Sequence, residues 1–97
     1  MATVTTTLGP LRFSIIDDVS TEQSFTVGTD TEALVLMASG ANVRIKTASG
    51  ADTSQQILVA NFKEVRTLPD LRGKTLWFEA VSGTPDVHVE EQLKQIP

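Results

Sequence analysis

Apolar and polar residues alternate over short segments along most of this 97-residue chain. In the segment Leu11–Ile16, Leu11, Phe13 and Ile15 fall on one side, because successive side chains of an extended strand point to opposite faces. Turn-forming residues separate such segments at a spacing of roughly 8–12 residues, which is typical of a sandwich or barrel. The predicted strands are Leu11–Ile16, Ser24–Val27, Ala33–Met37, Val43–Thr47, Gln55–Ala60, Phe62–Leu68, Thr75–Val81 and Asp86–Glu90.

Two of these segments predict different environments. Ala33–Met37 is apolar at every position, which indicates a central strand covered on both faces. Val43 and Ile45 alternate with Arg44 and Lys46, the pattern of a half-buried strand with one face in water.

The junction Ala60-Asn61 predicts a tight turn between two strands. Asparagine tolerates the left-handed backbone conformation that such a turn often requires. Asn61 is therefore expected to mark the point at which the chain leaves one strand and begins the next.

Together these patterns predict an all-β protein, a single antiparallel β-sandwich of jelly-roll-like or Ig-like type with about seven short strands. A chain of this length cannot build two independent cores, so residues 1–97 are expected to form one domain. Residues 1–10 predict an extended, threonine-rich arm without a core contribution. Residues 91–97 predict a tail that either adds a helical turn or trails from the domain.

Composition narrows the class of protein further. The chain has no cysteine, which excludes a disulfide framework and a thiolate metal site. No basic cluster followed by an apolar run opens the sequence, and no stretch approaches the ~20 apolar residues of a membrane helix. We therefore expect a soluble protein made in the cytosol, without a membrane partner.

The formal net charge is −4, and the acidic bias lies in residues 1–40, where Arg12 is the one basic residue. The remaining Lys and Arg residues are scattered among acids. Binding to phosphate backbones requires a clustered positive surface, so no nucleic-acid partner is expected.

His88 is the one histidine, and histidine is the usual base of nucleophilic catalysis. Alternation places it on the same strand face as Asp86 and Glu90, away from the neighbouring valines. This arrangement favours a solvated edge of a hairpin, although three such side chains are also able to contribute to a divalent-cation site.

The adjacent carboxylates Asp17-Asp18 are expected in a solvated turn, since neighbours on a strand point to opposite sides. The glycines are isolated, and no glycine-rich loop leads from a strand into a helix. We therefore expect no enzymatic activity, no catalytic residues, no metal and no cofactor.

The run Leu76-Trp77-Phe78 is the strongest candidate for a protein interface, because three large apolar residues in a row cannot all face one core. If Leu76 and Phe78 face inward, Trp77 shares the outer face with Glu79 and Val81. Tryptophan is enriched at interface hot spots. The alternative is that Trp77 packs beneath a loop or the second sheet of its own domain.

Leu11, Phe13 and Ile15 present a second candidate, either as the first core strand or as an arm donated to a neighbouring subunit. Basic residues follow the strands and turns in the later part of the chain. They are expected on solvated outer faces, where some are able to pair with acids across a subunit interface. These residues are Arg44, Lys46, Lys63, Arg66, Arg72 and Lys74.

From Phe25 onward the order of strands and turns resembles a group of small β-sandwich proteins found in tailed-phage particles. The likeness covers about two-thirds of the chain, with Asn61 standing where a glycine is common and with a longer stretch before Phe25. The segments that carry the resemblance are Thr31–Leu36, Asn42–Lys46, Ile57–Asn61, Phe62–Thr67 and the hairpin Thr75–Val89.

The resemblance implies a virion structural protein without enzyme activity, most often a decoration or cement protein on the capsid exterior. Its expected partners are the major capsid protein or another virion protein, and further copies of itself in a homo-oligomer. The alternatives are a tail or head-to-tail component and, from a different class, a carbohydrate-binding module.

Overall fold

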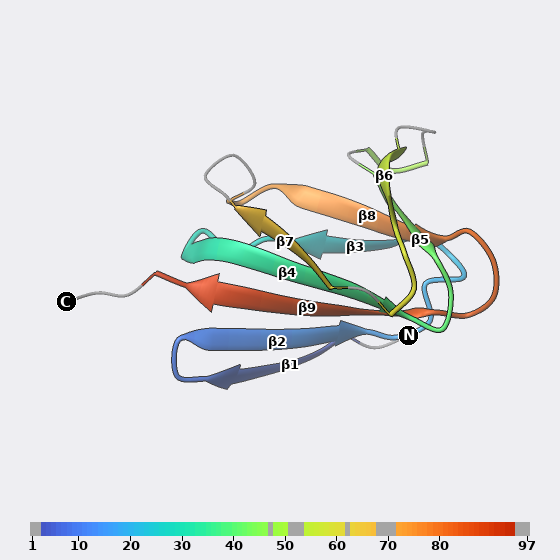
Figure 1. Cartoon of the computed structure of the whole chain (residues 1–97). Coiled ribbons are helices and arrows are strands. Elements are labelled where there is room, and N and C mark those ends of the chain that lie inside the picture. Colours follow the sequence, from blue (N-terminus) through green and yellow to red (C-terminus); the bar gives the residue numbers. More distant parts are fainter. Residues whose placement is uncertain (1–2, 47, 51–53, 62, 68–71, 95–97) are drawn as a thin grey trace.

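The computed structural model describes residues 3–46, 48–50, 54–61, 63–67 and 72–94 of the chain. These residues form nine strands and contain no helix (Figure 1). In chain order the strands are β1 (Thr3–Leu8), β2 (Leu11–Ile16), β3 (Gln23–Thr26), β4 (Thr31–Ser39), β5 (Val43–Lys46), β6 (Ser54–Leu58), β7 (Lys63–Thr67), β8 (Thr75–Ala80) and β9 (Asp86–Leu93).

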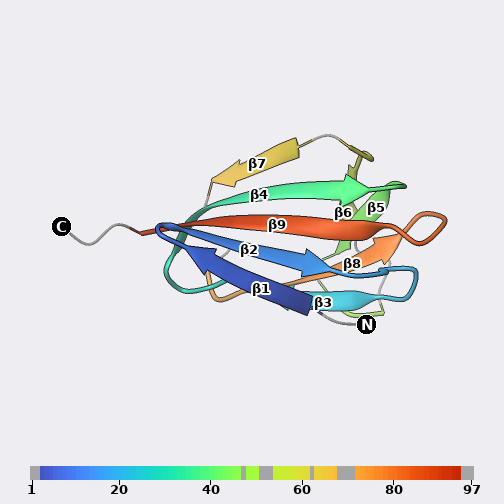
Figure 2. The ribbon, with the colours of Figure 1, turned by 90° about the horizontal axis from the view of Figure 1, so that it is seen from below.

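The strands build two layers. One sheet has the order β1-β2-β9-β4-β7 and the other the order β3-β8-β5-β6. All neighbouring strands within a sheet run antiparallel, and the second view shows β1, β2, β9 and β4 side by side with β3 and β8 behind them (Figure 2). The predicted antiparallel β-sandwich is confirmed, although the described residues form more strands than the seven or so expected.

The core lies between the sheets and follows the alternation of the sequence. Leu34 and Leu36 of β4 and Phe78 of β8 are almost completely buried, while the residues between them point outward. Full burial of side chains of this size stabilises a fold by roughly 1.5–3 kcal/mol each. The buried apolar set is Ile16, Val19, Val27, Leu34, Leu36, Ala38, Val43, Ile45, Leu58, Leu76, Phe78, Val87 and Val89.

The N-terminal segment corrects one prediction. Thr3–Leu8 is not a free arm but a strand, because Gly9-Pro10 makes a hairpin that pairs β1 with β2 from Leu8↔Leu11 to Thr3↔Ile16. Every described side chain of β1, from Val4 onward, is nevertheless exposed. The segment therefore joins the sheet while contributing nothing to the core, as the absence of a core pattern predicted.

The C-terminal segment corrects another prediction. β9 continues to Leu93, so Glu91 belongs to a central strand rather than to a tail, and its side chain is buried. Residues 95–97 lie outside the described residues.

The tight turn predicted at Asn61 is confirmed. Asn61 has a φ of 65°, and its N–H donates to the carbonyl of Ala38 at 2.7 Å. The turn sends the chain from β6 in one sheet to β7 in the other. Asp18, in the predicted turn after β2, is also left-handed, with a φ of 51°.

Candidate protein-binding faces

The outer face of the five-stranded sheet exposes large apolar side chains on adjacent strands. On β1, 60% of Val4 and 69% of Leu8 are exposed, and on β2, 36% of Phe13 and 41% of Ile15. The register Val4↔Ile15 and Leu8↔Leu11 places them beside one another on the same face. A contiguous apolar surface of this kind usually marks an interaction site, whereas single exposed apolar residues do not.

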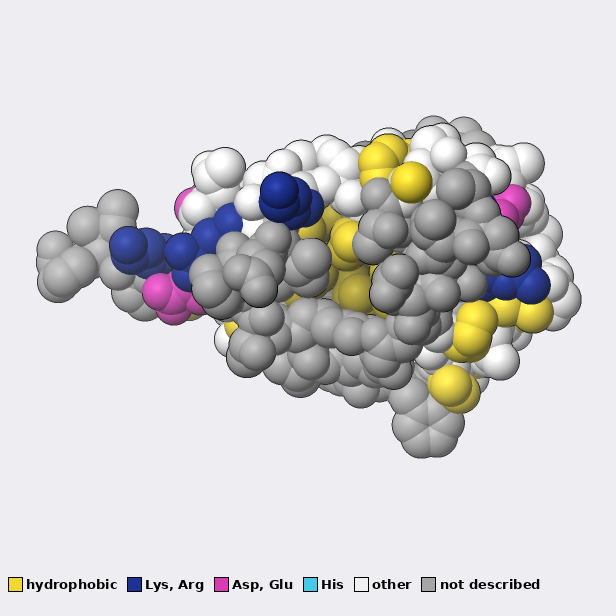
Figure 3. Space-filling view, turned by 90° about the horizontal axis from the view of Figure 1, so that it is seen from above, with side chains coloured by type: hydrophobic (Ala, Val, Ile, Leu, Met, Phe, Trp, Pro, Cys, Tyr) yellow, Lys and Arg dark blue, Asp and Glu magenta, His cyan; other side chains and the backbone are white. Residues whose placement is uncertain are grey.

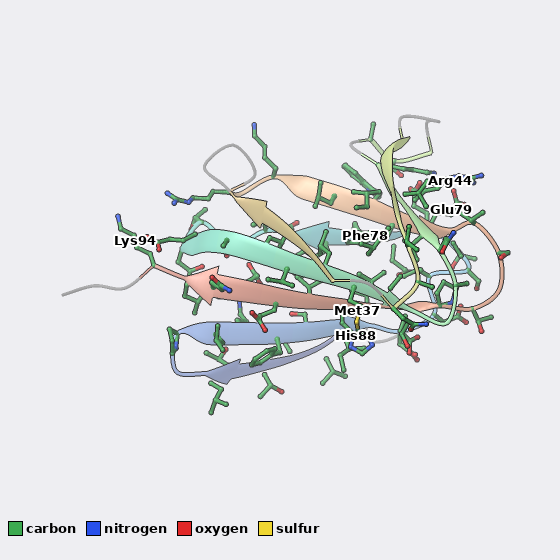
Figure 4. The ribbon with its side chains drawn as sticks, in the orientation of Figure 1. Met37, Arg44, Phe78, Glu79, His88 and Lys94 are labelled. Atoms are coloured by element: carbon green, nitrogen blue, oxygen red, sulfur yellow. The ribbon has the colours of Figure 1, made fainter. Side chains whose placement is uncertain are left out.

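This face continues across β9 onto β4. Ile15 lies opposite His88, which lies opposite Met37, and the labelled side chains of Met37 and His88 lie close together in Figure 4. The surface is hollowed there, with a cavity of about 270 Å³ that is open to solvent. Its lining is Phe13, Ser14, Ile15, Val35, Leu36, Met37, His88, Val89 and Glu90.

The predicted location of His88 at a hairpin edge is wrong. β9 lies between β2 and β4, so His88 is half-buried on the face of a central strand, beside Ile15 and Met37. Its shared face with Asp86 and Glu90 is as predicted. Among the described residues, no group of three or more histidine or acidic side chains is arranged to hold a metal ion.

The second predicted interface lies on the opposite side of the sandwich. Leu76 and Phe78 face the core as predicted, and Trp77 and Glu79 point outward, both half-buried. Val81, just beyond the strand, is 44% exposed. The two apolar features predicted from the sequence are therefore well formed but are not brought together, because they belong to outer faces of different sheets.

The prediction that Lys46 lies on a solvated face is wrong. Its side chain is 6% exposed, and its Nζ lies 2.8 Å from Glu22 and 2.7 Å from Glu79. Glu22 also accepts hydrogen bonds from Ser49 Oγ and from the N–H of Gly50. The hydrogen bond from Lys46, with those from Ser49 and Gly50, lowers the pKa of Glu22 to about 2. Hydrogen bonds to Glu22 and Glu79 raise the pKa of Lys46.

Other basic side chains do lie at the surface. Dark-blue side chains stand out near the end of the molecule where β9 ends (Figure 3). Lys74 and Lys94 are exposed, whereas Arg44 is half-buried. Arg44 lies near the opposite end of the molecule, where Figure 4 labels it. Lys63 and Arg66 lie in β7, where the structure does not describe the side chains.

A buried carboxylate forms the centre of a polar cluster between the sheets. Oε2 of Glu91 accepts from Thr31 Oγ1 at 2.6 Å and from the N–H of Gly28 at 2.9 Å, while Arg12 binds both its oxygens. Arg12 also donates to Asp30 at 3.0 Å. A Cβ at position 28 would collide with the ends of the Arg12 and Asp30 side chains, so a larger residue there would displace this ion pair.

The charge of Glu91 is well compensated. Burial favours the neutral acid and raises its pKa, but the hydrogen bonds from Arg12, Thr31 and Gly28 favour the anion more, so the net shift is downward. Hydrogen bonds to Glu91 and Asp30 raise the pKa of Arg12. A buried carboxylate that is fully paired in this way holds strands together rather than presenting a reactive group.

Sequence reasoning missed this cluster although a signal for it was present. Alternation from Val87 and Val89 places Glu91 on the inward face of β9, and alternation from Ile16 places Arg12 on the inward face of β2. Two opposite charges at inward positions predict a buried pair once the strands are known to be neighbours. That adjacency is a tertiary feature.

Comparison with models of protein families, with curated proteins and with solved structures gives no match for this chain. The described residues include no helix of the length and hydropathy needed to cross a membrane.

Proposed function

We propose that this protein is a non-enzymatic structural component of a phage virion that attaches to the capsid as a decoration or cement protein. The observation that carries the proposal is the apolar outer face of the five-stranded sheet, where Val4, Leu8, Phe13 and Ile15 are exposed side by side. The partner is the surface of a capsid subunit, and the resemblance of the strand order to tailed-phage sandwich proteins supports this choice.

The shape of the face suits attachment to another protein. The hollow over Phe13, Ile15 and Met37 is large enough to receive an apolar side chain of a partner. Buried anchors of this kind supply most of the free energy of an interface, while the surrounding contacts exclude water. His88 and Glu90 at the hollow provide polar groups for orientation.

Attachment to a repeated lattice does not require one tight contact. Where several copies are linked, each contact after the first forms at a high effective concentration, so weak individual contacts add to firm attachment. A chain of 97 residues with a modest core and one large apolar face is suited to this mode of binding.

The test uses virions from the source of the chain. Mass spectrometry of purified particles is expected to detect the protein, and stripped particles are expected to take up added wild-type protein. Ile15→Ser should reduce the bound copies roughly tenfold or more, because truncating an interface anchor weakens association by about 2 kcal/mol.

The matched control is Ile57→Ser in the other sheet. Ile57 is 40% exposed, close to the 41% of Ile15, so the two substitutions change surface hydrophobicity equally. Ile57→Ser, on the outer face of the four-stranded sheet, should bind particles far more strongly than Ile15→Ser. Absence of the protein from particles would refute the virion role, and equal binding by the two variants would refute the proposed face.

A further inference from the structure

Among the residues that the structure describes, none pairs with the outer side of the β1 backbone. This strand lies at the end of the five-stranded sheet, beside β2 (Figure 1). The hairpin loop is Gly9-Pro10, with a φ of 58° at Gly9, and proline at the second position restricts it to a type II′ turn. Such a turn makes Leu8 and Leu11 a hydrogen-bonded pair.

This turn fixes which backbone groups point outward. Hydrogen-bonded and non-hydrogen-bonded pairs alternate along an antiparallel ladder, so Thr6 and Val4 also bond to β2. The N–H and C=O groups of Thr3, Thr5 and Thr7 therefore point away from β2. They form a row of three donors and three acceptors along the free edge.

The sequence of β1 contains none of the usual protection of an edge strand. Natural sheets block their edges with charged residues, prolines or bulges, because an open edge pairs with other strands. β1 reads Thr-Val-Thr-Thr-Thr-Leu, without charge or proline, and its pairing with β2 has no bulge. The sequence of β7, at the other edge of the same sheet, is Lys-Glu-Val-Arg-Thr.

We propose that the open edge of β1 binds a second copy of this chain, with the two β1 strands antiparallel and Thr5 opposite Thr5 on a twofold axis. In this register Thr3 lies opposite Thr7 of the other copy. Every outward-pointing residue then meets an outward-pointing residue, and three residue pairs exchange backbone hydrogen bonds. A one-residue shift would place outward groups against inward ones, so it is excluded.

Charge favours the antiparallel orientation with a copy of the same chain. Asp17, Asp18 and Asp86 lie together at the end of the molecule where β1 begins, and the Asp18 N–H donates to Asp86 at 2.9 Å. A parallel arrangement would bring two such acidic ends side by side. The antiparallel arrangement places each acidic end beside the Gly9-Pro10 end of the other copy, which lies near the exposed base Lys94.

The side chains of β1 also favour a second copy. In the proposed register the cross-strand pairs include Thr5 with Thr5 and Val4 with Thr6, and pairs of β-branched side chains of this kind stabilise a sheet. Val4 and Thr6 lie on the outer face, so pairing makes the apolar faces of the two copies continuous. The edge alone is a small interface, so an association that depends on concentration is expected.

The experiment is sedimentation velocity of the full chain over a concentration series, with Thr5→Pro as the test variant. The wild type should approach twice the 10.5 kDa monomer mass as concentration rises. Proline at position 5 removes the outward N–H of both copies at the axis and leaves the bonds from β1 to β2 intact, as edge strands tolerate. The dissociation constant should rise roughly tenfold or more.

Thr5→Ala is the matched control. It removes the side chain and its 3.1 Å hydrogen bond with Ser14 Oγ but keeps the backbone N–H, so its dissociation constant should rise much less than that of Thr5→Pro. A wild type that stays monomeric at millimolar concentration would overturn the proposal. Equal dissociation constants for Thr5→Pro and Thr5→Ala would overturn it as well.

A second measurement needs no variant and remains decisive if Thr5→Pro fails to fold. Hydrogen exchange of the wild type is followed at low and high concentration. The amides of Thr5 and Thr7 should become protected at high concentration, while a protection that is independent of concentration would overturn the proposal. The virion test replaces Ile15 and this test replaces Thr5. A negative result in one experiment therefore leaves the other proposal standing.

Discussion

Arg12 and Glu91 form a two-point ion pair between neighbouring strands β2 and β9, with Nε to Oε1 at 2.9 Å and Nη2 to Oε2 at 3.0 Å. The side chain of Glu91 is 2% exposed and that of Arg12 23%. The chain thus maintains a charged pair at a position where a sandwich of this size usually places an apolar residue, and the stability of the fold depends on both partners being present.

Glu91→Gln should destabilise the protein by about 2–3 kcal/mol. The substitution preserves the shape of the side chain but removes the charge that compensates Arg12, and removing one partner of a buried pair is more costly than the pair itself is stabilising. Urea denaturation measures the change. Glu90→Gln, one residue earlier on the outer face, should have a free energy of unfolding within about 0.5 kcal/mol of the wild type. A similar loss in both variants would contradict the role given to Glu91.

Acid should destabilise the fold through the carboxylates whose pKa is lowered. A carboxyl group with a depressed folded-state pKa adds stability above its unfolded value, and this stability is lost as the pH falls through the folded-state pKa. For Glu22 that window runs from its ordinary 4.5 down to about 2. The pKa values of Asp30 and Glu91 are also lowered, by Arg12 among other groups.

Asp17 should act in the opposite direction. The hydrogen bond with Asp86, and the repulsion between the two carboxylates, raise the pKa of Asp17. Its contribution to stability is therefore present at low pH and is lost as the pH rises through the folded-state pKa.

The acid dependence attributed to Glu22 is measured as the urea midpoint between pH 7 and pH 2 for the wild type and for Glu22→Gln. The midpoint of Glu22→Gln should fall less steeply below pH 4.5, and parallel curves would contradict the assignment to Glu22.

Asn61 should tolerate glycine and reject valine. Its φ of 65° lies in the left-handed region, which is unfavourable for a β-branched residue by roughly 1–2 kcal/mol, and its side chain is exposed. Asn61→Val should therefore lower the free energy of unfolding by about that amount, while Asn61→Gly should match the wild type. Thermal and urea unfolding of both variants test this, and equal stability of all three proteins would show that the turn is not strained.

The strand pattern could be predicted because it depends on local alternation. Leu76 and Phe78 in the core, Trp77 outside, and Asn61 in a left-handed turn all follow from the period of an extended chain and the properties of single residues. β1 was missed as a strand because its threonines give no core signal, and none of its described side chains is buried.

The positions of polar groups could not be predicted in the same way. The burial of Lys46 depends on Glu22, which lies in a distant loop, and on Glu79 of the adjacent strand β8. The location of His88 on a central strand depends on the strand order of the sheet, since its own sequence neighbours are equally compatible with an edge. Alternation determines which face a residue takes, whereas only the pairing of distant strands determines what covers that face.

Trp77 remains a predicted interface residue, and its position allows a sharp test. It lies on the outer face of β8, opposite Ser24 of β3 and Lys46 of β5, with part of its indole exposed. Trp77→Ala should keep the fold and lower the free energy of unfolding by about 1–2 kcal/mol, because a half-exposed side chain loses only part of its burial energy. Phe78→Ala, at a fully buried position, should lose roughly 3–5 kcal/mol.

The same variant tests attachment at the second face. If the outer face of β8 contacts a neighbour in the capsid lattice, Trp77→Ala should weaken particle binding by about 2 kcal/mol, roughly 30-fold, since tryptophan is a frequent anchor of interfaces. Glu79→Gln is the control within this face, because Glu79 is paired with Lys46 inside the chain at 2.7 Å and should affect stability more than binding. Unfolding of Trp77→Ala would assign the indole to the core. If Trp77→Ala instead binds particles like the wild type, the outer face of β8 does not contribute, and attachment is assigned to the outer face of the five-stranded sheet.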